Sequence, residues 1–263
     1  MKYDIGDLLN SWPFDPDEFI ARRITARDGV EKVQIRIDMG MLQLEVTGRP
    51  DGQRPHGLES LLQHYRQKLG SRPATSDEEA PGLEEEACED LFQEAWQYYQ
   101  RYLALFYLED YQGVVQDTTH NLDIFDLVQR HADSDEIKWY FEQYFPHAVM
   151  MRARARAMQA LKTDNYVAAM HHVREGIGTI EDFLSQWEGE GEVVDDDFPE
   201  LTFLRDWIEE LEQERPLSDR EQLERDLTVA VEAENFEEAA RLRDKLRTMR
   251  PAFLSPGTPQ RSR

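Results

Sequence analysis

Apolar and polar residues alternate between residues 31 and 47, on both sides of a turn predicted at Met39-Gly40. The apolar positions are Val33, Ile35, Ile37, Leu42, Leu44 and Val46. Alternation puts these side chains on one face, so the pattern predicts a β-hairpin with one buried face. An isolated hairpin is only marginally stable in water, so this face needs a cover. The candidates are the aromatic segment at residues 12–19 and a short helix predicted at 57–69.

From residue 84 onward the apolar positions follow the period of a helix. The run AWQYYQRYLALFYLEDY (95–111), for example, has Trp96, Tyr99, Leu103 and Phe106 near 3.6-residue spacing. The pattern predicts helices at 84–108, 111–131, 135–145, 147–161, 165–187 and 199–213. The fold is therefore expected to be mainly α-helical, with a small α+β unit at the N-terminal end.

Stretches rich in Gly, Pro, Ser and acidic residues separate the patterned segments, because they offer almost nothing to bury. They suggest a division of the chain into seven parts. These are an α+β unit (1–69), a linker (70–83), a helical body (84–187), an acidic linker (188–198), a connecting helix (199–217), a helical hairpin (218–250) and a disordered tail (251–263).

A weak internal repeat lies in the helical body. The segment 110–114 (DYQGV) aligns with 165–169 (NYVAA), each with a turn-forming residue, an aromatic residue and then small residues. Residues 153–177 resemble a tetratricopeptide-type helical hairpin, with Ala157, Tyr166, Ala169 and Gly176 at its small, aromatic, small and small positions. The resemblance implies an irregular stack of helical hairpins; a plain helical bundle is the open alternative.

Residues 218–250 predict two short antiparallel helices. Leu223, Leu227, Ala230 and Val231 share one face of the first helix, and Ser218 with Glu221 forms a capping box at its start. A turn follows at Ala233-Glu234-Asn235, and Phe236 is expected to fill it. The apolar positions of the second helix, with the narrow spacing of a coiled coil, are Ala239, Leu242, Leu246 and Met249.

This segment resembles the UVR motif, a helical hairpin found in the bacterial excision-repair proteins UvrB and UvrC. The matching residues are Leu223, Leu227, Ala230, Asn235, Phe236, Glu237, Ala239, Ala240, Arg243 and Asp244. The resemblance implies a module for protein–protein association, which also occurs in bacterial adaptors of Clp-type chaperones and arginine kinases. The phosphate-binding loop of the repair ATPase and the cysteine pairs of the kinase-activator relatives do not occur in this sequence.

The predicted partner-binding residues follow from the hairpin and the resemblance. They are Leu223, Leu227, Val231, Phe236, Ala239, Ala240, Leu242, Arg243 and Leu246. Thirty-odd residues cannot bury both sides of such an apolar seam, so we expect it to dock on a protein partner or a second copy. Docking on the rest of this chain is the alternative.

The charge balance narrows the class of partner. The chain has 54 acidic residues against 30 Lys plus Arg, a formal net charge of -24. Duplex nucleic acid is not expected as a direct partner, because binding it requires basic residues that neutralise phosphates. A signal peptide and a membrane span are not expected either, and the single cysteine, Cys88, excludes an internal disulfide. These features together predict a cytoplasmic protein.

Other candidate chemistry is weaker. The seven histidines and the acidic runs do not have the spacing of a metal site, so no metal or cofactor is predicted. The aromatic run at 96–111 could line a ligand groove but is more typical of a core, and RARAR (152–156) could bind a phosphate or pair with acidic neighbours. Catalytic residues are not predicted.

The sequence therefore favours a non-enzymatic adaptor whose UVR-like hairpin docks a partner helix. One alternative is an acidic regulator of DNA excision repair or of Clp-type stress proteolysis. Another is an enzyme of unknown type with a pocket in the helical body.

Overall fold

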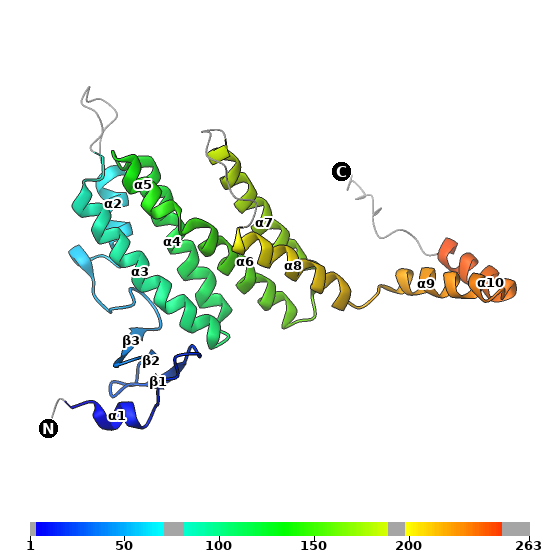
Figure 1. Ribbon diagram of the computed structural model, residues 1–263, viewed down its shortest axis with the longest axis horizontal. Helices are drawn as coiled ribbons and strands as arrows, with labels where there is room; N and C mark the ends of the chain where they lie inside the picture. Colours follow the sequence, from blue (N-terminus) through cyan, green and yellow to red (C-terminus); the bar gives the residue numbers. More distant parts are fainter. Residues whose placement is uncertain (1–3, 71–81, 189–197, 249–263) are drawn as a thin grey trace, which may run out of the picture. The chain divides into compact units, whose positions relative to one another are not determined.

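The computed structural model describes residues 4–70, 82–188 and 198–248 and divides the chain into two compact units, residues 1–212 and 213–263. The predicted fold class is confirmed: the chain is mainly helical, with a small antiparallel sheet near the N-terminal end and a C-terminal helical hairpin (Figure 1). The two predicted linkers fall largely, and the predicted tail wholly, outside the described residues.

The sheet has three antiparallel strands in the order β1-β2-β3. They are β1 (Ala21–Thr25), β2 (Glu31–Ile37) and β3 (Gly40–Glu45). The predicted hairpin is β2–β3, with Val33 opposite Leu44 and Ile35 opposite Leu42. Strand β1 was not predicted, and the turn lies one residue earlier than expected, at residues 38–39.

Both faces of β2 are covered, which corrects the prediction of one buried face. Gln34 and Arg36 are buried on the polar face, whereas Ile37, expected in the core, is 41% exposed. The segment before β1, which includes helix α1 (Gly6–Asn10), provides the cover, since Arg36 Nε donates to the Trp12 carbonyl at 2.7 Å. Arg36 also donates through Nη1 to the carbonyl of Gly40 at 2.8 Å. An arginine with so many carbonyl acceptors can be buried at little cost.

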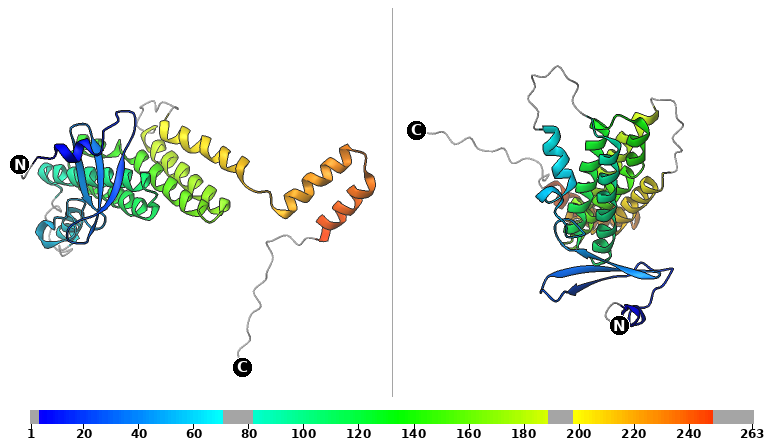
Figure 2. Two further views of the ribbon diagram at one scale, coloured as in Figure 1. Left: turned by 90° about the horizontal axis from the view of Figure 1, so that it is seen from below. Right: turned by 90° about the vertical axis from the view of Figure 1, so that its left-hand side faces the viewer.

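The apolar face of the sheet packs on helix α3 (Glu85–Tyr107) rather than on either predicted cover. Val33, Ile35 and Leu44 share a core cluster with Tyr102 and Leu105 of this helix. Figure 2 shows the sheet against one end of the helical layer. The short helix α2 (Leu61–Gly70), preceded by a 3-10 turn (Pro55–Gly57), packs on α3 and the helix that follows α3.

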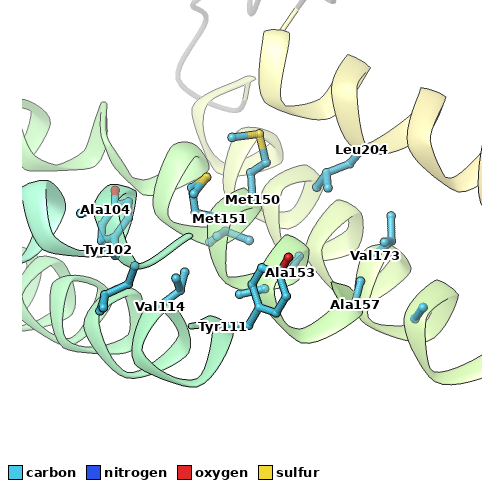
Figure 3. Close-up of a cluster of buried hydrophobic side chains, with 14 of the residues drawn as sticks. Tyr102, Ala104, Tyr111, Val114, Met150, Met151, Ala153, Ala157, Val173 and Leu204 are labelled. Carbon is cyan, nitrogen blue, oxygen red and sulfur yellow. The ribbon is translucent and has the colours of Figure 1, made fainter. Parts of the chain in front are cut away.

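The helical layer is built of antiparallel hairpins. Its further helices are α4 (Tyr111–His131), α5 (Asp135–Glu142), α6 (Phe145–Leu161), α7 (Tyr166–Glu188) and α8 (Pro199–Glu214). α3 pairs with α4 and α6 pairs with α7, while α4 also packs on α6 (Figure 1). Buried side chains of α3, α4, α6, α7 and α8 form one core cluster with the sheet, part of which Figure 3 shows around Tyr102, Met151 and Leu204. A second cluster joins α2, α3, α4, α5 and the start of α6.

Small residues bring α6 and α7 close together. Ala157 and Ala169, two of the predicted tetratricopeptide-like positions, are fully buried. At a third, Gly176, an added Cβ would lie 2.6 Å from the Cβ of Ala153, closer than real Cβ atoms come. The fourth, Tyr166, is half-buried against the core.

The two large hairpins turn in the same way. In each, a residue with positive φ (Glu109 at 58°, Asp164 at 54°) precedes an Asp or Asn that caps the next helix. Asp110 Oδ1 accepts from the amide of Gly113 at 3.1 Å, and Asn165 Oδ1 accepts from that of Ala168 at 3.0 Å. An aromatic residue, Tyr111 or Tyr166, follows each cap. The repeat seen in the sequence is therefore a repeat of this turn.

Buried charged side chains join the N-terminal segment to the helices. Glu94 of α3 is fully buried, and its carboxylate accepts from the first amides of α2, at 2.7 Å (Leu61) and 3.1 Å (Leu62). It also contacts Arg49 at 3.3 Å and His120 at 3.0 Å. The carboxylate thus caps the start of α2 together with Ser60, whose Oγ accepts from the Gln63 amide at 3.1 Å.

A second buried pair lies further along α3. Arg101 holds Asp117 of α4 with two hydrogen bonds of 2.8 and 2.7 Å. Its Nη1 donates to the carbonyls of Glu45 and Gly48, at 3.0 and 2.7 Å. One guanidinium therefore links the end of β3 to both helices of a hairpin.

Candidate functional site: the C-terminal helical hairpin

The C-terminal unit consists of α9 (Asp219–Glu232) and α10 (Phe236–Thr248), which pack on each other as a hairpin. The start of α9 has the predicted capping box: Ser218 Oγ accepts from the Glu221 amide at 3.3 Å, and the Glu221 carboxylate accepts from the Ser218 amide at 2.9 Å. Hydrogen bonds from Arg215 and from Ser218 lower the pKa of Glu221 to about 2.

The hairpin uses most of its apolar residues on its own seam. Leu223 and Ala230 of α9 and Ala239 of α10 are buried. The other predicted binding residues that face this seam are half-buried: Leu227, Ala240, Leu242 and Leu246. The small buried residues Ala230 and Ala239 allow the two helices to approach closely.

The turn between the two helices repeats the turn of the larger hairpins. Glu234 has φ 55°, and Asn235 Oδ1 accepts from the amide of Glu238 at 3.3 Å. Phe236 then takes the place that Tyr111 has in the first hairpin. Within the described residues, this turn thus occurs at 109–111, 164–166 and 234–236.

The aromatic residue after this turn has a different environment in the C-terminal hairpin. Tyr111 is 5% exposed, because it packs on the ring of Phe106, with 5.5 Å between the centroids, and because Lys162 Nζ lies 4.6 Å from its ring centroid. Phe236 is 70% exposed. The prediction that Phe236 fills its turn is therefore wrong: the ring points away from the hairpin's own seam.

Two further residues of the predicted set lie outside the seam. Val231 is 50% exposed, and its neighbour Val229 is 57% exposed. Arg243 is exposed and contacts Asp244 at 2.9 Å, and Arg241 likewise contacts Glu237 of its own helix at 3.1 Å. The structure thus separates the predicted set into a seam that holds the hairpin together and an exposed group of Val231, Phe236 and Arg243.

Comparison with known protein families agrees with this geometry. Residues 220–250 match the family model described as the UvrB/uvrC motif, UVR. This match confirms the resemblance to the UVR motif. No curated protein and no solved structure matches the chain. UVR is a non-catalytic interaction motif, so the match indicates a role in protein interaction or a role related to DNA repair.

The remaining candidates from the sequence lie in the first unit. Arg154 of the RARAR segment lies between two rings, 4.5 Å from Phe106 and 4.6 Å from Phe203, and Arg156 pairs with Glu175 at 3.4 Å. Among the described residues no cluster of His, Cys, Asp and Glu could hold a metal ion. In the same part of the chain, none of the helices combines the length and the apolar character needed to cross a bilayer.

The sequence pattern does not distinguish the buried polar residues of the helical body. Glu94, Arg101, Asp117 and Asn121 are all at most 3% exposed. Each stands in a helical pattern where a charged or amide residue normally faces solvent, and the sequence has no signal that distinguishes it from its exposed neighbours.

Proposed function

We propose that this protein is a cytoplasmic, non-enzymatic adaptor whose UVR hairpin docks a helix of a protein partner. The observation that supports it best is Phe236: the ring is 70% exposed at a turn whose counterpart Tyr111 is 5% exposed. Val229 and Val231 of the same hairpin are also at least half exposed, so the hairpin leaves three large apolar side chains open to solvent, as an interaction site does.

The covered turn in the first hairpin indicates what a partner would supply. Tyr111 is closed over by an aromatic ring from the end of one helix and by the ammonium of Lys162 at the end of another. A partner helix end that carries one apolar and one basic residue would cover Phe236 in the same way. The acids in the first turn of α10, Glu237 and Glu238, would attract the same basic residue.

The energetics of one aromatic residue are sufficient for a measurable test. Full burial of a phenylalanine side chain contributes about 1.5–3 kcal/mol. Loss of this contribution weakens binding by about 10- to 100-fold. We therefore expect Phe236→Ala to abolish recovery of the partner from native lysate and to leave both units folded.

The experiment compares the wild-type chain, Phe236→Ala and Met39→Ala as affinity baits. Met39 is the matched control, because it is 87% exposed at the β2–β3 turn in the other unit. Recovery lost with Phe236→Ala and retained with Met39→Ala supports the proposal. Equal recovery with all three baits contradicts it. Light scattering on the purified chain shows whether the partner is a second copy.

The acidic composition favours one alternative, a regulator of DNA excision repair or of Clp-type proteolysis that binds a basic partner. It rests on 54 acidic residues against 30 basic ones. Binding of that kind weakens steeply as salt rises, because exposed charges are screened within about 8–10 Å near physiological ionic strength. Docking through Phe236 depends on salt far less, so a salt series separates the two.

A further inference from the structure

The helical body contains a small aromatic cavity that neither the UVR motif nor the proposed function uses. Its volume is about 30 Å³. Its lining residues are Phe92, Ala95, Trp96, Tyr99, Tyr102, Asn121, Phe125, Tyr144 and His147. This is room for a group of about the size of two water molecules, such as the tip of a side chain, rather than for a whole cofactor.

Asn121 leaves a buried acceptor without a partner. It is 3% exposed, and its Nδ2 donates to the carbonyl of Ala95 at 2.9 Å. This bond fixes the orientation of the amide, because an oxygen at the same place would face the carbonyl oxygen. Asn121 Oδ1 is buried and makes no hydrogen bond with any described residue.

His147 supplies a second acceptor. Its Nδ1 lies 3.9 Å from a carboxylate oxygen of Glu200, and its Nε2 is buried without a hydrogen-bond partner in the described part of the chain. Burial lowers the pKa of His147, so the ring is neutral near pH 7. With the proton on the nitrogen that faces the carboxylate, Nε2 is an acceptor.

The remaining walls are aromatic rings. Trp96 stacks on Tyr99 with 5.0 Å between the ring centroids, and Tyr99 lies 5.7 Å from His147. On another wall, Phe92 lies 5.8 Å from Tyr144. Ring faces attract cations, and two unpaired acceptors require donors, so the lining suits a compact cation that carries several N–H groups.

An acidic groove adjoins the cavity, because Phe92 lines both. The groove has a volume of about 690 Å³ and lies between α3 and α5. Its carboxylates are Glu85 and Glu89 of α3 and Glu136 of α5. Trp139 (50% exposed) and Tyr140 (46% exposed) of α5 also line it. Carboxylates beside exposed aromatic rings favour a basic polypeptide over an acidic one.

We propose that this surface binds a basic segment of a protein partner and that the aromatic cavity takes the ammonium group of a lysine from that segment. Asn121 Oδ1 and His147 Nε2 accept hydrogen bonds from the ammonium, and the glutamates of the groove contact the neighbouring basic residues. A guanidinium is planar and larger than an ammonium, so the small volume selects lysine over arginine. The site belongs to the first unit and does not depend on the UVR hairpin.

The test uses the full chain and four peptides, acetyl-Lys-Gly-X-Gly-Lys-amide, in which X is lysine, arginine, norleucine or ε-acetyl-lysine. Binding is followed by NMR through the indole N–H signal of Trp96, assigned with a Trp96→Phe variant. We expect the peptide with X = lysine to bind most tightly. The norleucine and acetyl-lysine peptides should bind more weakly, because neither offers an ammonium to the two acceptors.

Three variants complete the design. Trp96→Ala, followed through the indole N–H signal of Trp139 in the groove, should weaken binding of the lysine peptide by about two- to fivefold, the range for a partly exposed cation–π contact. A triple variant should remove the salt dependence of binding, because it replaces the groove carboxylates Glu85, Glu89 and Glu136 with Gln. Phe236→Ala should leave peptide binding unchanged, which separates this site from the UVR hairpin. Trp96 is 50% exposed and the three glutamates are exposed, so these variants keep the core intact.

Two sets of results would overturn the proposal. One is equal affinity for the lysine and norleucine peptides, or no binding of any peptide, which would show that the cavity does not select a cation. The other is tighter binding of the arginine peptide, which would refute the assignment to lysine.

Discussion

The close contact of α6 with α7 predicts opposite effects for the same substitution at two glycines of one helix. A Cβ at Gly176 would lie 2.6 Å from the Cβ of Ala153 and 3.4 Å from Leu204 Cδ1, whereas a Cβ at Gly178 would meet no atom within 4 Å. Gly178→Ala should stabilise the unit by up to about 1 kcal/mol, the difference in helix propensity between Gly and Ala.

Gly176→Ala gains the same propensity but must push the helices apart. Overpacking of this kind costs about 1–3 kcal/mol, so the net change is between about zero and 2 kcal/mol of destabilisation. The two variants should therefore differ by about 1–3 kcal/mol, the steric contribution alone. In a unit of this size, 1 kcal/mol shifts the Tm by about 2–4 °C.

Thermal and urea unfolding of the wild-type chain and the two variants measures this difference. Adding Ala153→Gly to Gly176→Ala should recover part of the loss, because it removes the atom that the new methyl group meets. Equal stabilisation by Gly176→Ala and Gly178→Ala would show that α6 and α7 do not approach closely enough for the new methyl group to meet Ala153.

Two further predictions concern charged residues. Arg101→Met leaves Asp117 buried without its partner, so it should lower the free energy of unfolding by about 3–5 kcal/mol. Adding Asp117→Leu to Arg101→Met should restore part of this loss. Urea unfolding of the single and the double variant measures both effects. The pKa of Glu221 in the folded hairpin is about 2, against an ordinary value of 4.5. The ionised carboxylate therefore stabilises the hairpin fully above about pH 4.5, and this stabilisation is lost as the pH falls toward 2. An acid titration of hairpin helicity should show this loss in the wild-type chain and a smaller one in Glu221→Gln; identical titrations would contradict it.

The sequence predicted the helices well because periodic apolar positions and caps reinforce each other. Ser134 and Asp110 accept hydrogen bonds at the starts of α5 and α4, close to where the pattern placed those starts. The UVR hairpin was predicted for the same reason, since its capping box at Ser218 and its turn at Asn235 are local features. Local hydrogen bonds can be read from neighbouring residues alone.

The sheet was harder to predict because its covers come from distant segments. Strand β1 carries Arg22 and Arg23, and nothing in ARRIT marks it as a strand until β2 pairs with it. Arg36 reads as exposed, yet it is buried under the segment around Trp12. Such burial depends on which segment folds over the strand, and that information is not in the period of the strand itself.

The aromatic cavity could not be predicted from the sequence either, because distant segments form it. The run at 96–111 was expected to be core, and most of it is, but Trp96 and Tyr99 also line the cavity. Its acceptors, Asn121 and His147, lie on α4 and α6, far from that run in the sequence. Only the packing of three helices brings them together.

The buried hydrogen bonds between the sheet and the helices of the first unit affect how the chain folds during synthesis. The sheet is complete at Glu45, but its apolar face and its anchors need residues on α3 and α4: Arg101, Asp117 and, for the Glu94 cluster, His120. A ribosome adds about 5–20 residues per second, so the 75 residues from 45 to 120 take roughly 4–15 s. During this interval the nascent sheet exposes Val33, Ile35 and Leu44 and has no packing partner. Slow codons placed between residues 45 and 120 should therefore prolong exposure of this face to chaperones, whereas slow codons in the C-terminal unit, after residue 212, should not.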